Sequence, residues 1–336
     1  MSKEPKTIPE MVEMLRERGL KNKTDVDVAK YLYEINYYRF SGYARYYQVD
    51  PLSGNNTFYK NADIATIIKL IKLDKELRRI IFEGIQIFEI AFRASLAYQF
   101  VHTFGDYGYL NLDTYLPSGS KAKHKISSSY RLLNRIYSQI ERSDEPCMLH
   151  FKNKNERVPV YAAVEILTFD TIVTMYEYCN NFNCKKDITD SFDINDSDNQ
   201  STEARKIFGS NDRFIATLKV FSILRNLCAH HSRIWNRLMK TSPSLSRGVI
   251  EKYFPHDNNG ESNFPSENSV IRIICLLAMV VDEIEGNSLY SEHIFALIDS
   301  NKAFKNGLYS PTRGKVGWNG SRTSREKNKK RNNRNN

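Results

Sequence analysis

Apolar residues recur along most of the chain at steps of three and four positions, the spacing that places side chains on one face of an α-helix. The clearest example lies within residues 63–102, where the pattern predicts one long helix or a pair of helices. Glu89 and Arg93 stand one helical turn apart beside the apolar positions, so the sequence also predicts an ion pair between them. The apolar face itself consists of Ile81, Ile85, Phe88, Phe92 and Leu96.

The same periodicity predicts further helices along the chain, and no segment shows the strict alternation typical of a half-buried strand. Two segments, 187–203 and 241–265, are polar or contain Pro and Gly, and we expect loops there. The prediction is therefore an all-α protein, an irregular helical bundle. The further helices are expected at residues 9–19, 26–35, 126–140, 159–167, 213–240 and 269–284.

Charge and composition divide the chain into three predicted parts. Residues 1–50 form a helical N-terminal extension packed on the core, and residues 51–308 form the main domain. The formal net charge is +10, and residues 309–336 carry most of it, with nine Lys or Arg and one Glu. Because that segment is almost free of apolar residues, we expect a disordered basic tail. Such a tail can add affinity for nucleic-acid phosphates or can simply aid solubility, and the sequence leaves both open.

Several classes of protein are disfavoured by the sequence. The longest apolar run, 270–281, is shorter than the roughly 20 residues of a membrane span. Five scattered cysteines show no CxxC spacing, which argues against a disulfide framework and a structural zinc site. No cluster of paired carboxylates suggests a catalytic metal pair. We therefore expect a cytoplasmic protein without membrane contact, metal or cofactor.

Aromatic residues and arginines are interleaved in residues 31–48, with the sequence YLYEINYYRFSGYARYYQ. Such a pattern can stack nucleic-acid bases on exposed rings. Packing of the rings between helices is the more common use of aromatic residues, and we favour it here.

The segment with the most chemistry is LRNLCAHHSRIWNR, residues 224–237. If the predicted helix continues through it, one polar stripe forms from Asn226, His230, Arg233 and Arg237. Arg225 and His231 add two more cationic or titratable side chains to the cluster. Like charges on adjacent turns repel, so this crowding favours an anionic partner.

RNA fits that requirement because each phosphodiester lies next to its own nucleophile, the 2′-hydroxyl. Histidine can move protons near neutral pH, and arginine offers forked donors that match phosphate oxygens. Cleavage by these groups requires no metal. The alternative is that His230 caps a neighbouring helix and the arginines form salt bridges, and residue chemistry alone does not decide between the two interpretations.

The spacing of Arg225, Asn226 and His230 resembles the RxxxxH signature of HEPN ribonucleases, and the longer string resembles abortive-infection proteins of the AbiD/AbiF type. Four more segments match that family's pattern in order, so the resemblance covers roughly residues 9–237. They are EMLRERGL, INYYRFSGY, LDKELRRIIFEGIQIFEIAFRASLAY and VPVYAAVEILTF.

The resemblance implies a HEPN-like helical core in which two motifs face each other across a homodimer. It implies His230 as the acid and base, Arg225 as the group that stabilises the transition state, and Asn226 as the residue that orients His230. His231, Arg233 and Arg237 would contact the RNA substrate. The implied function is an endoribonuclease toxin of phage defence.

Two expectations complete the sequence analysis. The alternative function is a non-catalytic RNA-binding module held by an RNA or protein antitoxin. Glu165, which also lies at a matched position, is expected to be a buried structural partner of an arginine rather than an active-site group.

Overall fold

The computed structural model describes residues 4–115, 122–193, 206–254 and 264–311. It is all-α, as predicted, with one small antiparallel sheet in which β1 (Gln48–Asp50) pairs with β2 (Asn55–Phe58). The first helices are α1 (Ile8–Glu17), α2 (Val28–Ile35), α3 (Tyr37–Ala44) and α4 (Ile64–Phe104). The middle helices are α5 (Ala122–Arg142), α6 (Pro146–Asn153), α7 (Val160–Ile166), α8 (Phe169–Tyr178) and α9 (Phe182–Asp190). The last are α10 (Asn211–Ala229), α11 (Arg247–Tyr253), α12 (Ile271–Glu285), α13 (Leu289–Asp299) and α14 (Lys302–Tyr309).

Helix α4 is the axis of the molecule, and it is a single helix of 41 residues rather than a pair. At a rise of 1.5 Å per residue it is roughly 60 Å long. Asp63 caps its first turn by accepting a hydrogen bond from the Ala65 backbone N–H at 2.9 Å. Gly105, at φ 74°, ends it in a conformation that glycine adopts without strain.

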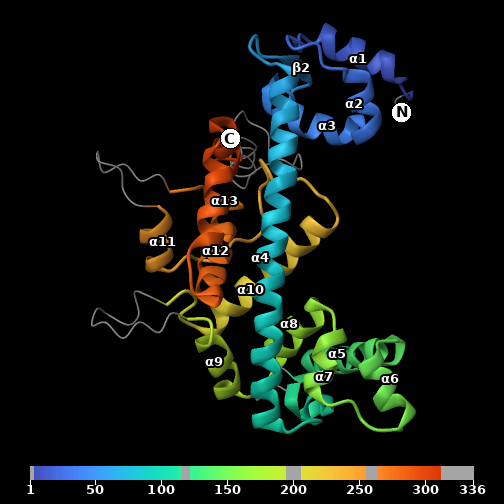
Figure 1. Ribbon diagram of the computed structural model, residues 1–336, viewed down its shortest axis with the longest axis vertical. Coiled ribbons are helices and arrows are strands. Elements are labelled where there is room, and N and C mark those ends of the chain that lie inside the picture. The colour runs from blue at the N-terminus through green and yellow to red at the C-terminus, as the bar shows by residue number, and fades with distance from the viewer. Residues whose placement is uncertain (1–3, 116–121, 194–205, 255–263, 312–336) are drawn as a thin grey trace, which may run out of the picture.

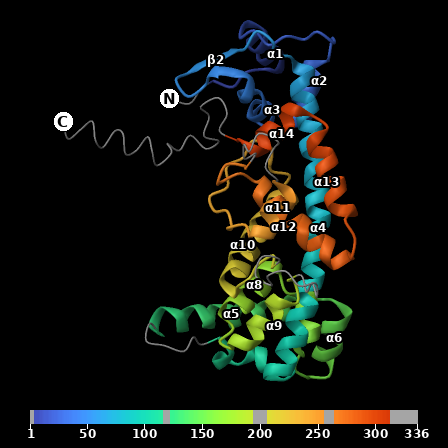
Figure 2. The same ribbon diagram turned by 90° about the vertical axis from the view of Figure 1, so that its left-hand side faces the viewer.

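The other elements are distributed along α4 in three groups (Figures 1 and 2). Helices α1 to α3 and the small sheet surround its N-terminal end, and α5 to α9 surround its C-terminal end. Helices α10, α12 and α13 pack against α4 between these two groups. The end of α10 therefore lies toward the group that contains α3.

The core around the C-terminal half of α4 is aromatic. The Phe88 ring lies 5.0 Å from that of Phe221 and 5.9 Å from that of Phe92. Phe214 joins the cluster at 5.8 Å from Phe92, and all four side chains are fully buried. Phe88 and Phe92 belong to the predicted apolar face, and Phe214 and Phe221 of α10 pack on it, so burial of that face helps to fix how α10 packs on α4.

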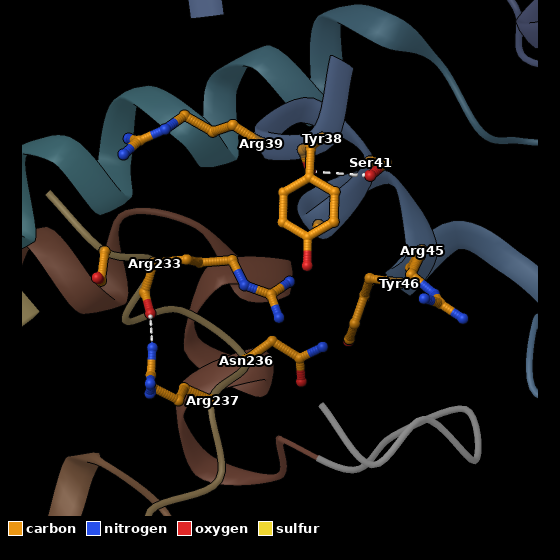
Figure 3. Close-up of a pocket in the computed structure, with 10 residues that line it drawn as sticks. Tyr38, Arg39, Ser41, Arg45, Tyr46, Arg233, Asn236 and Arg237 are labelled. Carbon is orange, nitrogen blue, oxygen red and sulfur yellow. Dashed lines mark hydrogen bonds between the residues drawn. The ribbon is translucent and has the colours of Figure 1, made fainter. Parts of the chain in front are cut away.

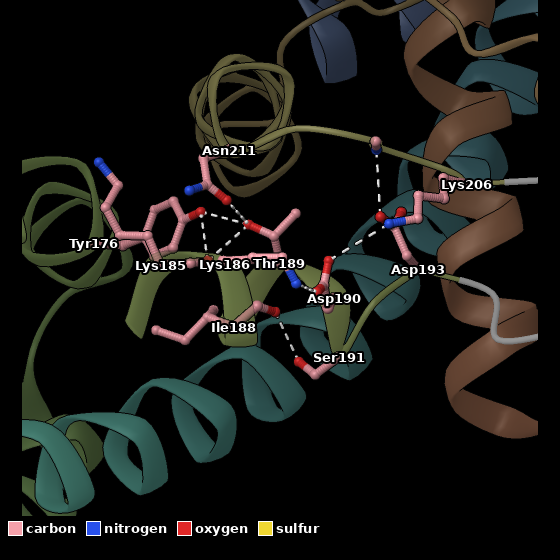
Figure 4. Close-up of polar contacts among 11 residues, drawn as sticks. Tyr176, Lys185, Lys186, Ile188, Thr189, Asp190, Ser191, Asp193, Lys206 and Asn211 are labelled. Carbon is pink, nitrogen blue, oxygen red and sulfur yellow. Dashed lines mark hydrogen bonds and ion pairs between the residues drawn. The ribbon is translucent and has the colours of Figure 1, made fainter. Parts of the chain in front are cut away.

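Polar contacts between α8, α9 and the start of α10 hold that packing in place (Figure 4). Thr189 donates a hydrogen bond to the side-chain oxygen of Asn211 at 2.8 Å, and its hydroxyl lies 2.6 Å from that of Tyr176. Asp193 accepts hydrogen bonds from the backbone N–H groups of Phe208 and Gly209. The N-terminal end of α10 is thus fixed by groups from three segments.

Most predicted helices are confirmed, but three boundaries are wrong. The helix expected at 213–240 ends at Ala229, and the loop expected at 241–265 contains α11. The loop expected at 187–203 begins later than predicted, because α9 continues to Asp190, and its residues 194–203 lie outside the described residues. Most of the predicted basic tail, from residue 312 onward, lies outside the described residues, and the division into three parts stays a prediction. Within the described ranges, no helix has both the length and the apolar character needed to cross a membrane.

Candidate functional site: a histidine turn beside an arginine pocket

Helix α10 ends within the segment that carries the predicted chemistry. The His230 N–H donates to the Asn226 carbonyl at 3.0 Å, and the Ser232 N–H reaches back to the Leu227 carbonyl at 2.8 Å. His231 has φ 53°, a left-handed conformation that closes the helix. The predicted stripe is therefore wrong, because Arg233 and Arg237 follow a turn and do not continue the helical face of Asn226.

A buried carboxylate fixes the chain after this turn. Asp74 of α4 is fully buried and accepts hydrogen bonds from the Trp235 N–H at 2.8 Å and the Ile234 N–H at 3.4 Å. It also accepts the hydroxyl of Tyr43 and pairs with Arg78. Arg78 in turn donates to the Ser232 carbonyl at 3.4 Å. The segment from Ser232 to Trp235 is thus held to the long helix by interactions that span the sequence.

The two histidines are exposed on this anchored turn, whereas Arg225 and Asn226 are half-buried on α10. Arg225 donates to the side-chain oxygen of Asn226 at 3.5 Å. Among the described residues, no hydrogen bond joins the side chain of Asn226 to that of His230. The expected orienting contact is therefore absent from the described structure, and Asn226 contacts Arg225 instead.

Arg225 faces a second, smaller cavity of about 240 Å³, which it lines together with Glu89 and Arg93. The predicted ion pair between Glu89 and Arg93 is confirmed. Arg93 also donates to the backbone carbonyls of Val164 and, at 2.9 Å, Leu167. Arg93 therefore closes the end of α7, and the cavity keeps the guanidinium of Arg225 near two charged neighbours.

The expectation for Glu165 is wrong. Its side chain is exposed, and Arg93 pairs with Glu89 and with backbone carbonyls instead. Burial falls on the neighbouring positions Ala163, Val164 and Leu167. The face of a seven-residue helix is set by what it packs against, and the sequence around Glu165 does not show that.

A cavity of about 580 Å³ lies directly beside the histidine turn, between α3 and residues 232–237 (Figure 3). We call it the arginine pocket because four arginines line it and none of the described residues in its lining is acidic. The remaining lining residues are polar, aromatic or small. The complete lining is Tyr38, Arg39, Ser41, Gly42, Arg45, Tyr46, Ser232, Arg233, Asn236 and Arg237.

The arginine pocket is connected to the histidine turn by hydrogen bonds. Arg39 donates to the backbone carbonyl of His231, and Arg237 donates to that of Arg233 at 3.1 Å. The Arg233 guanidinium lies over the ring of Tyr43, 5.6 Å from its centroid. Burial lowers the pKa of Arg233 to about 10 and also lowers that of Arg237. An anion in the pocket would offset the cost of burying these cations.

Two of the predicted RNA-contacting residues, Arg233 and Arg237, thus lie in one pocket, but their partners Arg39 and Arg45 were missed. These two arginines lie in the aromatic-rich segment, for which we favoured packing between helices. The packing interpretation holds for Phe40 and Tyr43, which are fully buried, whereas Tyr38 is 86% exposed and base stacking on it stays a prediction. The signal that could have found Arg39 and Arg45 was the alternation of arginine with tyrosine.

Within the described part of the chain, no three His, Cys, Asp or Glu residues gather as a metal site would require.

The chain belongs to the Abi-like protein family, whose family model matches residues 30–236. The matched region contains α3, α4, α10 and nearly all of the lining of the arginine pocket. Membership indicates a role in abortive infection, a form of phage defence. No curated protein and no solved structure matches the chain.

Proposed function

We propose that this protein is a metal-independent endoribonuclease toxin of an abortive-infection system. The observation that carries the proposal is the placement of His230 and His231. Both are exposed on a turn that Asp74 anchors, at the border of a pocket lined by four arginines. A rigid turn beside concentrated positive charge is suited to holding an RNA phosphate against a group that moves protons.

In this proposal, His230 removes the proton of the 2′-hydroxyl or protonates the leaving 5′-oxygen. The 2′-oxygen attacks the adjacent phosphorus, the bond to the 5′-oxygen breaks, and the products carry a 2′,3′-cyclic phosphate and a 5′-hydroxyl. Arg225 stabilises the negative charge that builds up on the phosphate oxygens. Asn226 contributes by positioning Arg225, the contact that the structure contains.

The proposal includes a homodimer. Arg225 opens onto a cavity of its own, while Arg39 of the arginine pocket donates to the backbone carbonyl of His231, the residue after His230. A two-fold interface brings the same patch of two chains together, so Arg225 of one protomer can stabilise the charge on a phosphate at which His230 of its partner transfers the proton. RNA is the proposed substrate, and an RNA or protein antitoxin is a proposed partner.

Cleavage of a mixed RNA pool in EDTA tests the proposal. The proteins are wild type, Arg225→Ala, His230→Ala and, as a matched control, His102→Ala. His102 is an exposed histidine at the far end of α4, where it packs on Tyr98. We expect wild type and His102→Ala to cut, leaving 2′,3′-cyclic phosphate ends, and the other two variants to lose at least about 100-fold in rate.

The non-catalytic alternative gives a different result in the same experiment. If none of the four proteins cuts but all bind RNA alike, the protein is an RNA-binding module and the catalytic proposal fails for that pool. Expression in the host adds a second test. A nuclease should be tolerated only after replacement of His230, whereas a passive binder should be tolerated without any change.

A further inference from the structure

Two residues that line the arginine pocket each have a buried polar atom without a hydrogen-bond partner among the described residues: the side-chain oxygen of Asn236 and the hydroxyl of Tyr46. Asn236 is only 5% exposed. A buried polar group without a hydrogen-bond partner is unfavourable, so such a group beside a cavity points to a ligand that satisfies it. In Figure 3 the Asn236 amide extends toward the same space as the Arg233 guanidinium and the Tyr38 hydroxyl.

The chemistry of these atoms specifies the ligand further. The guanidinium groups can only donate hydrogen bonds, and a phosphate can only accept them at neutral pH. The Asn236 oxygen can only accept, so a phosphate alone cannot satisfy it. A ligand that fits the whole pocket must therefore carry a phosphate and, a few ångströms away, a hydrogen-bond donor.

We propose that the arginine pocket binds one nucleotide of a single-stranded RNA, with its phosphate on Arg233 and its ribose 2′-hydroxyl on Asn236. The 2′-hydroxyl both donates and accepts, so it satisfies the Asn236 oxygen and can also accept from Tyr46. The inference deepens the proposed function, because it names the subsite that holds the RNA strand beside the histidine turn.

The shape and borders of the pocket fit a nucleotide. Its volume of about 580 Å³ is within the range of roughly 300–1,000 Å³ that small-molecule sites occupy. Tyr38 lines the opening with a ring that is 86% exposed, a surface on which a base can stack. Arg39 contacts both the pocket and the His231 carbonyl, so the neighbouring nucleotide would lie against the exposed histidines.

Tyrosine-to-phenylalanine variants give a matched test of the inference. The hydroxyl of Tyr46 is buried without a partner in the pocket, and that of Tyr47 is buried without a partner outside its lining. Neither Tyr46→Phe nor Tyr47→Phe breaks a hydrogen bond of the free protein, so both should fold. Asn236 has φ 53°, and Asn236→Gly removes its side chain without strain at that conformation.

The measurement is fluorescence anisotropy with a labelled single-stranded oligoribonucleotide and the DNA of the same sequence. All proteins carry His230→Ala so that binding is measured without cleavage. We expect Tyr46→Phe to weaken RNA binding about three- to tenfold and Tyr47→Phe to leave it unchanged. We expect the parent to prefer RNA over DNA, and Asn236→Gly to remove most of that preference while Arg142→Ala, an exposed arginine of α5, keeps it.

Two outcomes would overturn the inference. One is an RNA-to-DNA affinity ratio that is the same in the parent, Tyr46→Phe and Asn236→Gly. The other is competition by free adenosine monophosphate as tight as that by the oligonucleotide, which would make a free nucleotide the ligand. Because binding is measured apart from cleavage, the two proposals can fail separately. If the pocket variants Tyr46→Phe and Asn236→Gly cut RNA normally, only this inference is refuted. If the variants bind RNA as expected but wild type does not cut it, only the proposed nuclease activity is refuted.

Discussion

Two arginines near the histidine turn have different surroundings: Arg78 is buried beside a carboxylate, and Arg233 is half-buried in the arginine pocket. Arg78 pairs with the carboxylate of Asp74 and donates to the Ser232 carbonyl. Burial disfavours its charge, yet Asp74 and Tyr43 outweigh that effect and raise its pKa. Arg233 faces a pocket without acidic residues, and burial lowers its pKa to about 10. The comparison separates a cation that stabilises the fold from one that is suited to an anionic ligand.

The largest expected effect comes from removing Asp74, the carboxylate that pairs with Arg78. Asp74→Ala leaves Arg78 buried without its carboxylate and removes the acceptor of Trp235 N–H and Tyr43. Loss of one partner of a buried ion pair typically costs about 3–5 kcal/mol, and we expect that decrease in the free energy of unfolding. Urea denaturation measures it. Glu76→Ala, which removes an exposed partner of Arg79 on the same helix, is the control and should change stability little.

A second comparison concerns Arg93 and Arg225, which line the same small cavity. Arg93→Met loses the pair with Glu89 and leaves the Val164 and Leu167 carbonyls without their donor. We expect a loss of about 1–3 kcal/mol in the free energy of unfolding. Arg225→Met should lose far less stability and should abolish RNA cleavage. Equal destabilisation by the two substitutions would show that Arg225 is structural as well.

Arg233→Met tests whether Arg233 serves ligand binding, in contrast to Arg78, which stabilises the fold. Burial disfavours the charge of Arg233, so Arg233→Met should leave the free protein as stable or raise its stability by about 1 kcal/mol. RNA affinity should fall by about tenfold or more, because a charge-assisted contact to phosphate is lost. Thermal unfolding and anisotropy on the same preparation measure both effects. A large loss of stability with unchanged RNA affinity would place Arg233 with Arg78 as a structural residue.

The smallest effect is expected for Arg79→Ala. Arg79 lies on α4 next to Arg78, but its side chain is exposed and pairs with Glu76 and Glu83 on the surface. Surface ion pairs contribute little because water and salt screen them. We expect no measurable change in the midpoint of denaturation or in RNA affinity. A clear loss of RNA affinity would mean that the RNA surface extends along this face of α4.

The spacing of apolar residues was sufficient to predict the helices that have a clear apolar face and the ion pairs within a helix. The apolar face at Phe88 and Phe92 predicted α4, and in the structure α10 packs on that face. The pair of Glu89 and Arg93 followed from helical spacing alone. These features depend on residues three or four positions apart, which a sequence displays directly.

The end of α10 and the full pocket could not be predicted in that way. The helix stops at Ala229, and Asp74, 160 residues away from Ile234, holds the chain that follows. His231 and Asn236 adopt left-handed conformations there, which local helical patterns do not show. Arg39 and Arg45 join Arg233 only through the packing of α3 on α4. The sequence thus contained the residues of the site but not their arrangement.

The most direct test of the account uses an RNA in which one nucleotide is altered at a mapped cleavage position. Wild-type protein is given this RNA with either a 2′-hydroxyl or a 2′-hydrogen at that nucleotide, in EDTA, and His230→Ala is assayed beside it. The account predicts that wild type cuts only the RNA with the 2′-hydroxyl at that bond and leaves a 2′,3′-cyclic phosphate. Cleavage of the deoxy-substituted bond, or an unchanged rate with His230→Ala, would contradict the proposed attack by the 2′-hydroxyl and the role of His230.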